Sequence, residues 1–240
     1  MSEPLLSVSH LTKEYRFKEQ TVMGIQDISF SLCGGECLGI VGESGSGKST
    51  LGRLIAGMDT PTAGTVSFQG ERVQMIFQNP FASVNPRMKL SEILSEPLSI
   101  SHIGTRRQRF KRVEEVLSQI GLPPTVLNCY PGELSGGQLQ RAVIGRSLIC
   151  SPELLVADEP TASLDVSIQA QMIKLLLEIR ETTGMALIFI SHDLPLVRHL
   201  CGRIAVLDRG KLAELGETEK IWENPESEAA KKLLAGRLNF

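Results

Sequence analysis

The strongest chemical signal in this 240-residue sequence is a glycine-rich loop that ends in lysine and serine. Residues 42–50 read GESGSGKST, which fits the pattern GxxxxGK[ST] between an apolar run and a helix-forming run. The glycines let backbone N–H groups wrap phosphate oxygens, and the N-terminus of the following helix adds the positive end of its dipole. Lys48 is expected to reach the β- and γ-phosphates of a nucleotide, and Ser49 is expected to bind Mg²⁺. The residues expected to line this loop are Gly42, Glu43, Ser44, Gly45, Ser46, Gly47, Lys48, Ser49 and Thr50.

A second signal is the pair of carboxylates that ends the apolar run LLVADE at residues 154–159. The carboxyl ends of strands in an open parallel sheet line the ligand crevice, so both side chains are expected beside the phosphates. Asp158 is placed to hold Mg²⁺ through water, and Glu159 to act as the general base on an attacking water. The alternative is a strand end followed by an exposed acidic turn, but the glycine-rich loop upstream favours catalysis.

Two further polar residues follow apolar runs. His192 in FISHDL comes after a predicted core strand, which favours a catalytic place on the phosphate side of the sheet. Gln78 in MIFQNP also ends a predicted strand, where its amide is expected to contact Mg²⁺ or the attacking water. A lone histidine is more often structural than catalytic, so these two assignments depend on the glycine-rich loop and the carboxylates.

A second loop of small residues, ELSGGQ at 133–138, opens another predicted helix. A helix N-terminus with close backbone access is a second anion site. It lies beyond a long helical stretch, so it is not expected to reach the phosphates held by the first loop of the same chain. A site without its own nucleotide can be completed by a second copy of the chain.

Short apolar runs alternate with amphipathic stretches, which predicts an α/β core with a mostly parallel sheet to align these residues. From about residue 81 to 135 helices and loops predominate, so a helical subdomain is expected as an insertion in a single domain covering residues 1–240. The face expected to pack one of its helices consists of Val113, Val116, Leu117 and Ile120.

Composition narrows the function classes. The net charge of −2 gives no global attraction to nucleic acid or anionic lipid, and the basic run 105–112, TRRQRFKR, is interpreted as a solvated helix face. Five cysteines without a CxxC pair favour a reducing compartment, and Cys33 with Cys37 makes a poor metal site. No signal peptide and no membrane-spanning segment are expected, because the first residues lack a basic region followed by a long apolar run and no apolar run approaches 18 residues.

The chain carries, in order, the glycine-rich loop, FQ, LSGGQ, LLVADEP, SLD and SHD. Through these motifs the sequence resembles the nucleotide-binding subunit of ATP-binding cassette (ABC) transporters over essentially the whole chain. The resemblance implies a RecA-like P-loop core with a mostly parallel sheet, an antiparallel β-subdomain and an inserted α-helical subdomain. It also implies a head-to-tail dimer that encloses two ATP molecules. Each ATP would lie between the glycine-rich loop of one chain and four residues of the other, Ser135, Gly136, Gly137 and Gln138.

The resemblance further implies roles for single residues. Tyr15 in LTKEYRF matches the aromatic residue that stacks on adenine, and His192 matches the histidine that contacts the γ-phosphate. Gln78 matches the loop that links the ATP site to the helical subdomain docked on the membrane protein. The segment that crosses to the opposite ATP site is matched by Ser163, Leu164 and Asp165.

Two stretches, QNPFASVNPRMKLSEILSEPL and DEPTASLDVSIQAQMIKLL, look like the oligopeptide, dipeptide and nickel importer group. Two departures are a short segment before RVQMIFQ, near residue 70, and a short C-terminus. The resemblance implies an ATPase that powers import of nickel, metal chelates or peptides at the cytoplasmic face of the inner membrane. Its implied partners are two multi-span permeases, a second ATPase subunit and, indirectly, a substrate-binding protein.

Two other functions were weighed against the importer. A soluble ABC ATPase that acts on nucleic acid or ribosomes usually has two fused cassettes, a coiled-coil insertion or basic extensions, and the sequence has none of these. A P-loop kinase would not explain LSGGQ. The importer is therefore favoured, and no nucleic-acid partner is expected.

Overall fold

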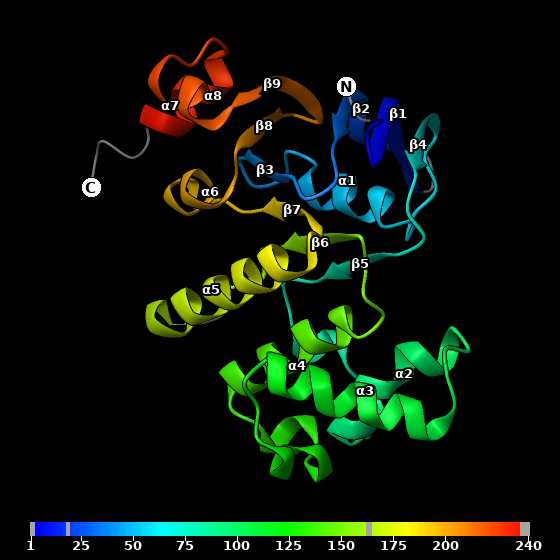
Figure 1. Ribbon diagram of the computed structural model, residues 1–240. Coiled ribbons are helices and arrows are strands. Elements are labelled where there is room, and N and C mark those ends of the chain that lie inside the picture. The colour runs from blue at the N-terminus through cyan, green and yellow to red at the C-terminus, as the bar shows by residue number, and fades with distance from the viewer. Residues whose placement is uncertain (1–2, 18–19, 162–164, 236–240) are drawn as a thin grey trace. The chain divides into compact units, whose positions relative to one another are not determined.

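The computed structural model describes residues 3–17, 20–161 and 165–235, which form two compact units (Figure 1). The first unit consists of the described residues up to Met75, those of Glu153–Glu159 and those from Gly184 onward. The second consists of Ile76–Pro152 and the described part of Pro160–Thr183.

The first unit is built on a six-stranded sheet with the order β5-β6-β7-β3-β8-β9. Strands β3, β6 and β7 are buried at every position, as expected for central strands of a parallel sheet covered on both faces. The pairs β6–β7, β7–β3 and β3–β8 are parallel, and β9 joins the edge antiparallel to β8. The strands are β3 (Cys37–Gly42), β5 (Val73–Ile76), β6 (Leu154–Asp158), β7 (Ala186–Ile190), β8 (Arg203–Asp208) and β9 (Lys211–Glu217).

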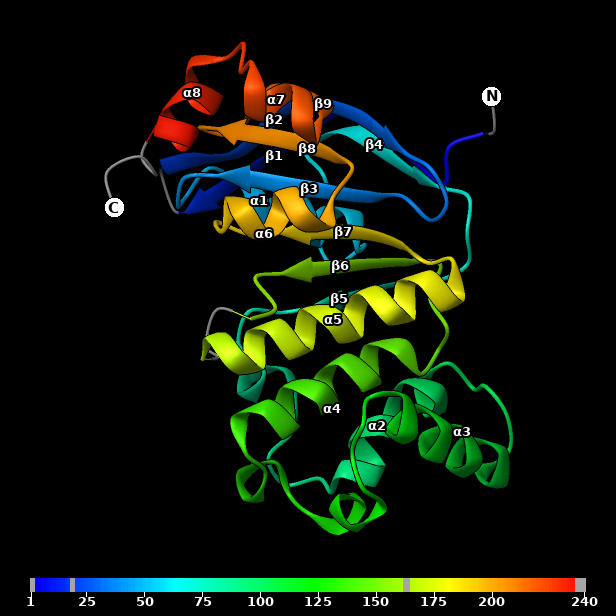
Figure 2. The same ribbon diagram turned by 60° about the vertical axis from the view of Figure 1, so that its left-hand side comes forward.

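A three-stranded antiparallel sheet with the order β2-β1-β4 completes the β-structure of this unit. Its strands are β1 (Leu6–Phe17), β2 (Gln20–Leu32) and β4 (Ala63–Phe68). This sheet and α1 lie on one face of the six-stranded sheet, and the other helices of the unit lie on the opposite face (Figures 1 and 2). The helices are α1 (Lys48–Ile55), α6 (Leu194–Leu200), α7 (Thr218–Glu223) and α8 (Glu228–Ala235).

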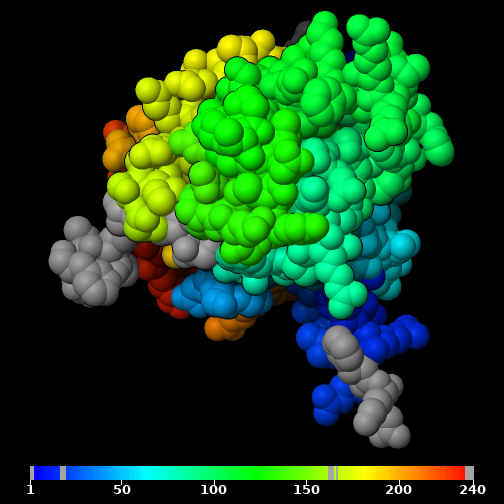
Figure 3. All heavy atoms as spheres, turned by 90° about the horizontal axis from the view of Figure 1, so that it is seen from below, coloured from blue at the N-terminus to red at the C-terminus, as the bar shows by residue number. Residues whose placement is uncertain are grey.

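The second unit is helical, and its surface faces the viewer in Figure 3. Helix α3 buries the face expected from its sequence, because Val113, Val116, Leu117 and Ile120 are each at most 1% exposed. The α-helices are α2 (Leu90–Ile100), α3 (Arg106–Gln119), α4 (Gly136–Leu148) and α5 (Val166–Thr183). Short 3₁₀ turns occur at η1 (Phe81–Ser83), η2 (Pro124–Asn128) and η3 (Pro131–Glu133).

The predicted fold class is confirmed: an α/β chain with a mostly parallel sheet, a separate antiparallel sheet and a group of helices. The helical unit contains the stretch 81–135 and extends beyond it to include α4 and α5. Within the described part of the chain, no helix is both long and apolar enough to cross a bilayer.

Candidate active site

The glycine-rich loop connects the buried strand β3 to α1, with Gly47 as the N-cap of the helix. Gly47 has φ of 100°, and a Cβ there would lie 2.6 Å from the carbonyl oxygen of Gly24, so the backbone admits only glycine. A second loop supports this turn from behind, because Gly210 donates its N–H to the carbonyl of Ser46 at 3.0 Å. The hydroxyl of Ser46 is buried and has no hydrogen-bond partner among the described residues. A rigid loop with a spare buried hydroxyl suits an anionic ligand.

Lys48 lies across the inside of this loop. Its Nζ donates to the carbonyls of Gly42 and Glu43 at 2.8 and 2.9 Å, and the side chain is buried. Burial lowers the Lys48 pKa, and the nearby carboxylates of Glu159 and Asp158 oppose that shift. Two backbone hydrogen bonds thus hold the lysine nitrogen at the loop.

The two predicted Mg²⁺ ligands of this unit lie together. Asp158 ends β6 and is buried, and the Ser49 hydroxyl, in the first turn of α1, forms a hydrogen bond with its carboxylate. Burial raises the Asp158 pKa, and the hydrogen bond from Ser49 and the charge of Lys48 lower it in part. A hydroxyl and a carboxylate oxygen are hard donors of the kind that Mg²⁺ prefers.

Glu159 and His192 form a pair at the adjoining strand ends. Asp158 pairs with Ile190 in the register of β6 and β7, so the residues that follow these two strands emerge at the same edge. The Glu159 Oε1 lies 3.2 Å from His192 Nδ1, and the His192 side chain is 70% exposed. A base candidate and a histidine therefore stand together at the edge where the glycine-rich loop begins.

The backbone of Glu159 is strained. Its φ of 46° lies in the left-handed region, which costs a non-glycine residue on the order of 1–2 kcal/mol. The N–H of Glu159 donates to the carbonyl of Ile190 at 2.9 Å, which anchors this conformation to β7. Strain of this kind persists where the surrounding structure fixes it, and it concentrates at functional sites.

Tyr15, the predicted adenine-stacking residue, lies on β1 in the same unit. Its hydroxyl donates to Asp59 at 3.0 Å and accepts from Arg53 at 3.2 Å, and the Lys13 ammonium lies 5.1 Å from the ring centroid. A Cβ on Gly24 would lie 2.8 Å from Tyr15 Cε2 and 3.2 Å from Thr50 Cγ2. The tyrosine is therefore fixed close to the first turn of α1.

The second small-residue loop begins α4 in the helical unit. Ser135 is the N-cap: its hydroxyl accepts from the Gln138 N–H at 3.3 Å, and Gln138 Oε1 accepts from the Ser135 N–H at 3.0 Å. Ser135 and Gly136 are exposed, and a Cβ on Gly136 would meet nothing within 4 Å. Gly137 is buried against Ile168. The loop thus offers an open helix N-terminus on a packed base.

Two further predicted site residues, Gln78 and Asp165, belong to the helical unit. Gln78 is exposed and follows the end of β5 by two residues. Asp165 accepts from the N–H groups of Ser167 and Ile168 at 3.1 and 3.0 Å and so caps α5; hydrogen bonds, chiefly from the Ser167 hydroxyl, lower its pKa. Ser163 and Leu164 lie outside the described residues.

Comparison with known proteins decides the family. Residues 25–162 match the family described as ABC transporter. The chain belongs to the ABC transporter family. This ABC ATPase is 42% identical to a putative peptide import ATP-binding protein of Brucella ovis, over 97% of the chain and 78% of that protein. It is 43% identical to the oligopeptide transport ATP-binding protein OppF of Bacillus subtilis, over 98% of the chain and 83% of that protein.

Solved structures agree with this placement. The dimeric post-hydrolysis state of the ATP-binding cassette MJ0796 bound to ADP and Pi has a TM-score of 0.79 and 28% identity, over 89% of the chain and 98% of that structure. The cbiO1 subunit from Clostridium perfringens, part of the ABC transporter complex cbiONQ, has a TM-score of 0.79 over 99% of the chain and 96% of its own. Its 24% identity supports the fold alone. The ABC ATPase binds and hydrolyses ATP, as predicted.

Sequence reasoning did not find three supporting residues of this ABC ATPase. Gly210 backs the glycine-rich loop through its N–H, Arg53 donates to Tyr15, and the Ser191 hydroxyl accepts from the Asp193 N–H at 3.0 Å beside His192. Gly210 and Arg53 stand in no recognisable motif, and Ser191 stands in SHD, where only His192 was assigned a role. The hairpin glycine after β8 was the only available signal for Gly210, and it is equally consistent with an ordinary turn.

Proposed function

We propose that this chain is the ATP-hydrolysing subunit of a peptide importer and works as a head-to-tail dimer on two membrane permeases. The observation that carries the proposal is similarity over nearly the whole chain to proteins named for peptide or oligopeptide import. Peptides are preferred to nickel and metal chelates as cargo, because none of these relatives is named for metal transport.

At the first unit, ATP places its phosphates in the loop from Gly42 to Thr50, where backbone N–H groups and the Lys48 ammonium neutralise their charge. Ser49 and Asp158 would hold Mg²⁺, with Gln78 as the third member of the predicted ligand set, and the bound ion would neutralise charge on the phosphate oxygens. Tyr15 stacks on the adenine ring.

Hydrolysis is carried out by the pair at the ends of β6 and β7. Glu159 accepts a proton from the water that attacks the γ-phosphorus, so the water oxygen forms the new bond as the bond to the β-phosphate oxygen breaks. His192, 3.2 Å from Glu159, contacts the γ-phosphate and keeps the carboxylate aimed at the water. The products are ADP and inorganic phosphate.

The open N-terminus of α4 completes the nucleotide site of a second copy or of a paralogous ATPase. Ser135, Gly136, Gly137 and Gln138 present backbone N–H groups and a hydroxyl to the partner's γ-phosphate, and Asp165 lies in the segment that crosses to the same site. ATP favours the closed dimer because it contacts both chains there, and hydrolysis removes these contacts and reopens it.

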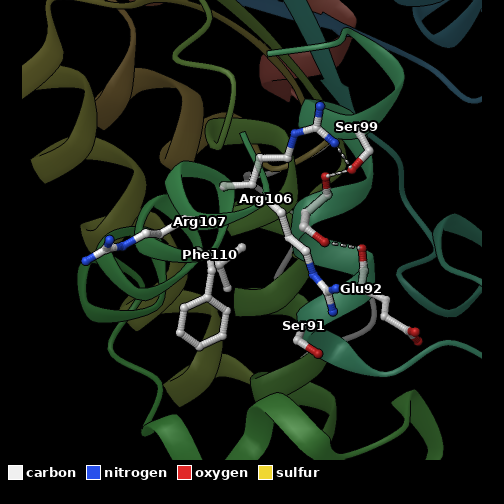
Figure 4. Close-up of a pocket in the computed structure, with 9 residues that line it drawn as sticks. Ser91, Glu92, Ser99, Arg106, Arg107 and Phe110 are labelled. Atoms are coloured by element: carbon white, nitrogen blue, oxygen red, sulfur yellow. Dashed lines mark hydrogen bonds between the residues drawn. The ribbon is translucent and has the colours of Figure 1, made fainter. Parts of the chain in front are cut away.

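A pocket of about 880 Å³ between α2 and α3 supports a docking role for the helical unit (Figure 4). Phe110 is 52% exposed at its rim, and Arg106 and Arg107 are exposed and have no ion pair among the described residues. In Figure 4 Arg106 extends across the pocket toward Ser91 and Glu92, and Arg107 points away from it. We assign this pocket to a cytoplasmic segment of the permease that carries an apolar and an acidic side chain. The basic run at 105–112 is then partly an interaction surface and not only a solvated face.

The proposal is tested by tagging the chain, extracting it from its native membranes in mild detergent and identifying the proteins that co-purify. Two multi-span permeases, and ATPase activity of the complex that rises with a peptide mixture and not with nickel or its chelates, are expected. Stimulation by nickel alone would overturn the peptide assignment. Recovery with ribosomes or DNA and without permeases would overturn the importer.

The docking pocket is tested in the same purification. Arg106→Glu reverses the charge inside the pocket and is expected to reduce permease recovery severalfold, whereas Lys111→Glu is the matched control on the same helix. Lys111 is 78% exposed, does not line the pocket, and its Nζ lies 4.0 Å from Glu115 Oε1. Equal permease recovery with both variants would remove the pocket from the interface.

A further inference from the structure

Gln140 lies on the buried side of α4, two residues after the exposed loop that begins this helix. Its side chain is 1% exposed, and its Nε2 donates to the carbonyl of Pro160 at 2.5 Å. Both residues belong to the helical unit. A carbonyl only accepts hydrogen bonds, so the amide must present its nitrogen to Pro160.

The other end of this amide is unsatisfied. Gln140 Oε1 is buried and has no hydrogen-bond partner among the residues that the structure describes. A buried acceptor without a partner is unfavourable, and an apolar side chain of the same length, such as methionine, would avoid that cost. Stability therefore does not explain a glutamine at this position, whereas a functional role for the hydrogen bond donated by its Nε2 explains it.

The acceptor of this hydrogen bond belongs to the segment that carries Glu159. Proline has no N–H, so the carbonyl is the sole backbone hydrogen-bonding group of Pro160, and Gln140 occupies it. Glu159 has φ of 46°, and a residue before proline is normally driven to extended conformations, so its backbone is unfavourable for two reasons. Ile190 holds this segment from the Glu159 N–H, and Gln140 holds it from the Pro160 carbonyl.

We infer that Gln140 is a positioning residue for ATP hydrolysis: through Pro160 it holds the left-handed backbone that aims the Glu159 carboxylate. The inference rests on the proposed role of Glu159 as the base. It adds a physical link between the two nucleotide sites of the dimer. Helix α4 begins with Ser135, which serves the partner's ATP, and five residues later the same helix fixes the segment after the base of its own chain.

The test replaces Gln140 with methionine in the full chain, purified with the subunits that accompany it. Loss of the donor is expected to lower kcat about fivefold to tenfold, the change equivalent to one neutral hydrogen bond, and to leave KM for ATP unchanged. The melting temperature without nucleotide is expected to stay level or rise, because the unsatisfied Oε1 is also removed. Gln119→Met, at an exposed glutamine at the end of α3, is the matched control and is expected to resemble wild type in all three measurements.

A second variant separates donor chemistry from packing. Gln140→Glu keeps the length of the side chain but places a carboxylate against the Pro160 carbonyl, and it recovers a donor only when protonated. Its kcat relative to wild type at the same pH is expected to rise as the pH is lowered from about 8 to 6, whereas the ratio for Gln140→Met stays flat.

Two results would overturn the inference. One is wild-type kcat in Gln140→Met, and the other is a parallel loss of melting temperature, ATP affinity and kcat without recovery of Gln140→Glu at lower pH. Failure of the proposed role of Glu159 is recognised separately, as full hydrolysis by Glu159→Gln.

Discussion

Two glycines of the phosphate-binding loop provide a test of how tightly this loop is built. Gly45 and Gly47 both have positive φ, 79° and 100°. A Cβ on Gly47 would lie 2.6 Å from the carbonyl oxygen of Gly24 and 2.7 Å from Ile25 Cγ2, whereas a Cβ on Gly45 would meet nothing within 4 Å. Alanine at both positions therefore adds the same backbone strain, but only at Gly47 does it also force two backbone segments apart.

The expected magnitudes follow from these two contributions. Left-handed strain costs alanine about 1–2 kcal/mol, which applies to Gly45→Ala and to Gly47→Ala alike. Displacement of packed backbone adds about 1–3 kcal/mol, which applies to Gly47→Ala alone. At about 3 °C per kcal/mol for a chain of this size, Gly45→Ala is expected to lower the melting temperature by about 3–6 °C, and Gly47→Ala by about 6–15 °C.

The assay is thermal unfolding without nucleotide, followed by circular dichroism, together with calorimetric titration of ATP. Gly47→Ala is also expected to weaken ATP binding at least tenfold, because the displaced loop no longer aligns its N–H groups with the phosphates. Equal losses of melting temperature in the two variants, or a Gly47→Ala protein as stable as wild type, would refute the packing argument. Gly57→Ala, with φ of 68° and open space around the Cβ, is the control outside the loop.

Three other predictions concern the site residues. Glu159→Gln removes the base and is expected to lower ATP turnover, measured by phosphate release, at least a hundredfold. ATP is still expected to bind and to trap a closed dimer, measured by size-exclusion chromatography; undiminished hydrolysis would exclude Glu159 as base. Ser135→Arg fills the exposed loop at the start of α4 and is expected to block dimer formation with ATP. Because this loop belongs to the helical unit and not to the unit with the glycine-rich loop, the monomer's ATP affinity, measured by calorimetry, is expected to change less than about twofold; lost affinity in the monomer would contradict the two-chain site. Burial raises the Asp158 pKa above its value in the unfolded chain, so the carboxylate costs stability above the folded-state pKa, and this cost is absent below the unfolded-state value near 3.8. Asp158→Asn is therefore expected to raise stability by about 1 kcal/mol at pH 7.5, with a gain that fades toward pH 4 in thermal unfolding and with hydrolysis lost; a gain independent of pH would contradict this account.

Local sequence pattern was enough to predict the fold class, which the structure confirms, and to propose the residue types of the candidate site. The spacing of glycines, Lys48 and Ser49 marks a phosphate loop because only that arrangement combines a tight turn, close backbone approach and a positive charge. The apolar runs that end in Asp158 and before His192 predicted strands, and in a parallel sheet the ends of such strands must meet at one edge. These inferences depend on local pattern, which a linear sequence contains in full.

Tertiary structure decided how those residues are held. Two hydrogen bonds join segments distant in sequence: Gly210 donates to the carbonyl of Ser46, and Gln140 donates to the carbonyl of Pro160. The left-handed backbone of Glu159 is a torsion angle set by its surroundings. The pocket beside the basic run 105–112 likewise depends on the packing of α2 beside α3 in the folded chain. No periodicity or motif records such contacts, because they depend on which segments the folded chain brings within hydrogen-bonding distance.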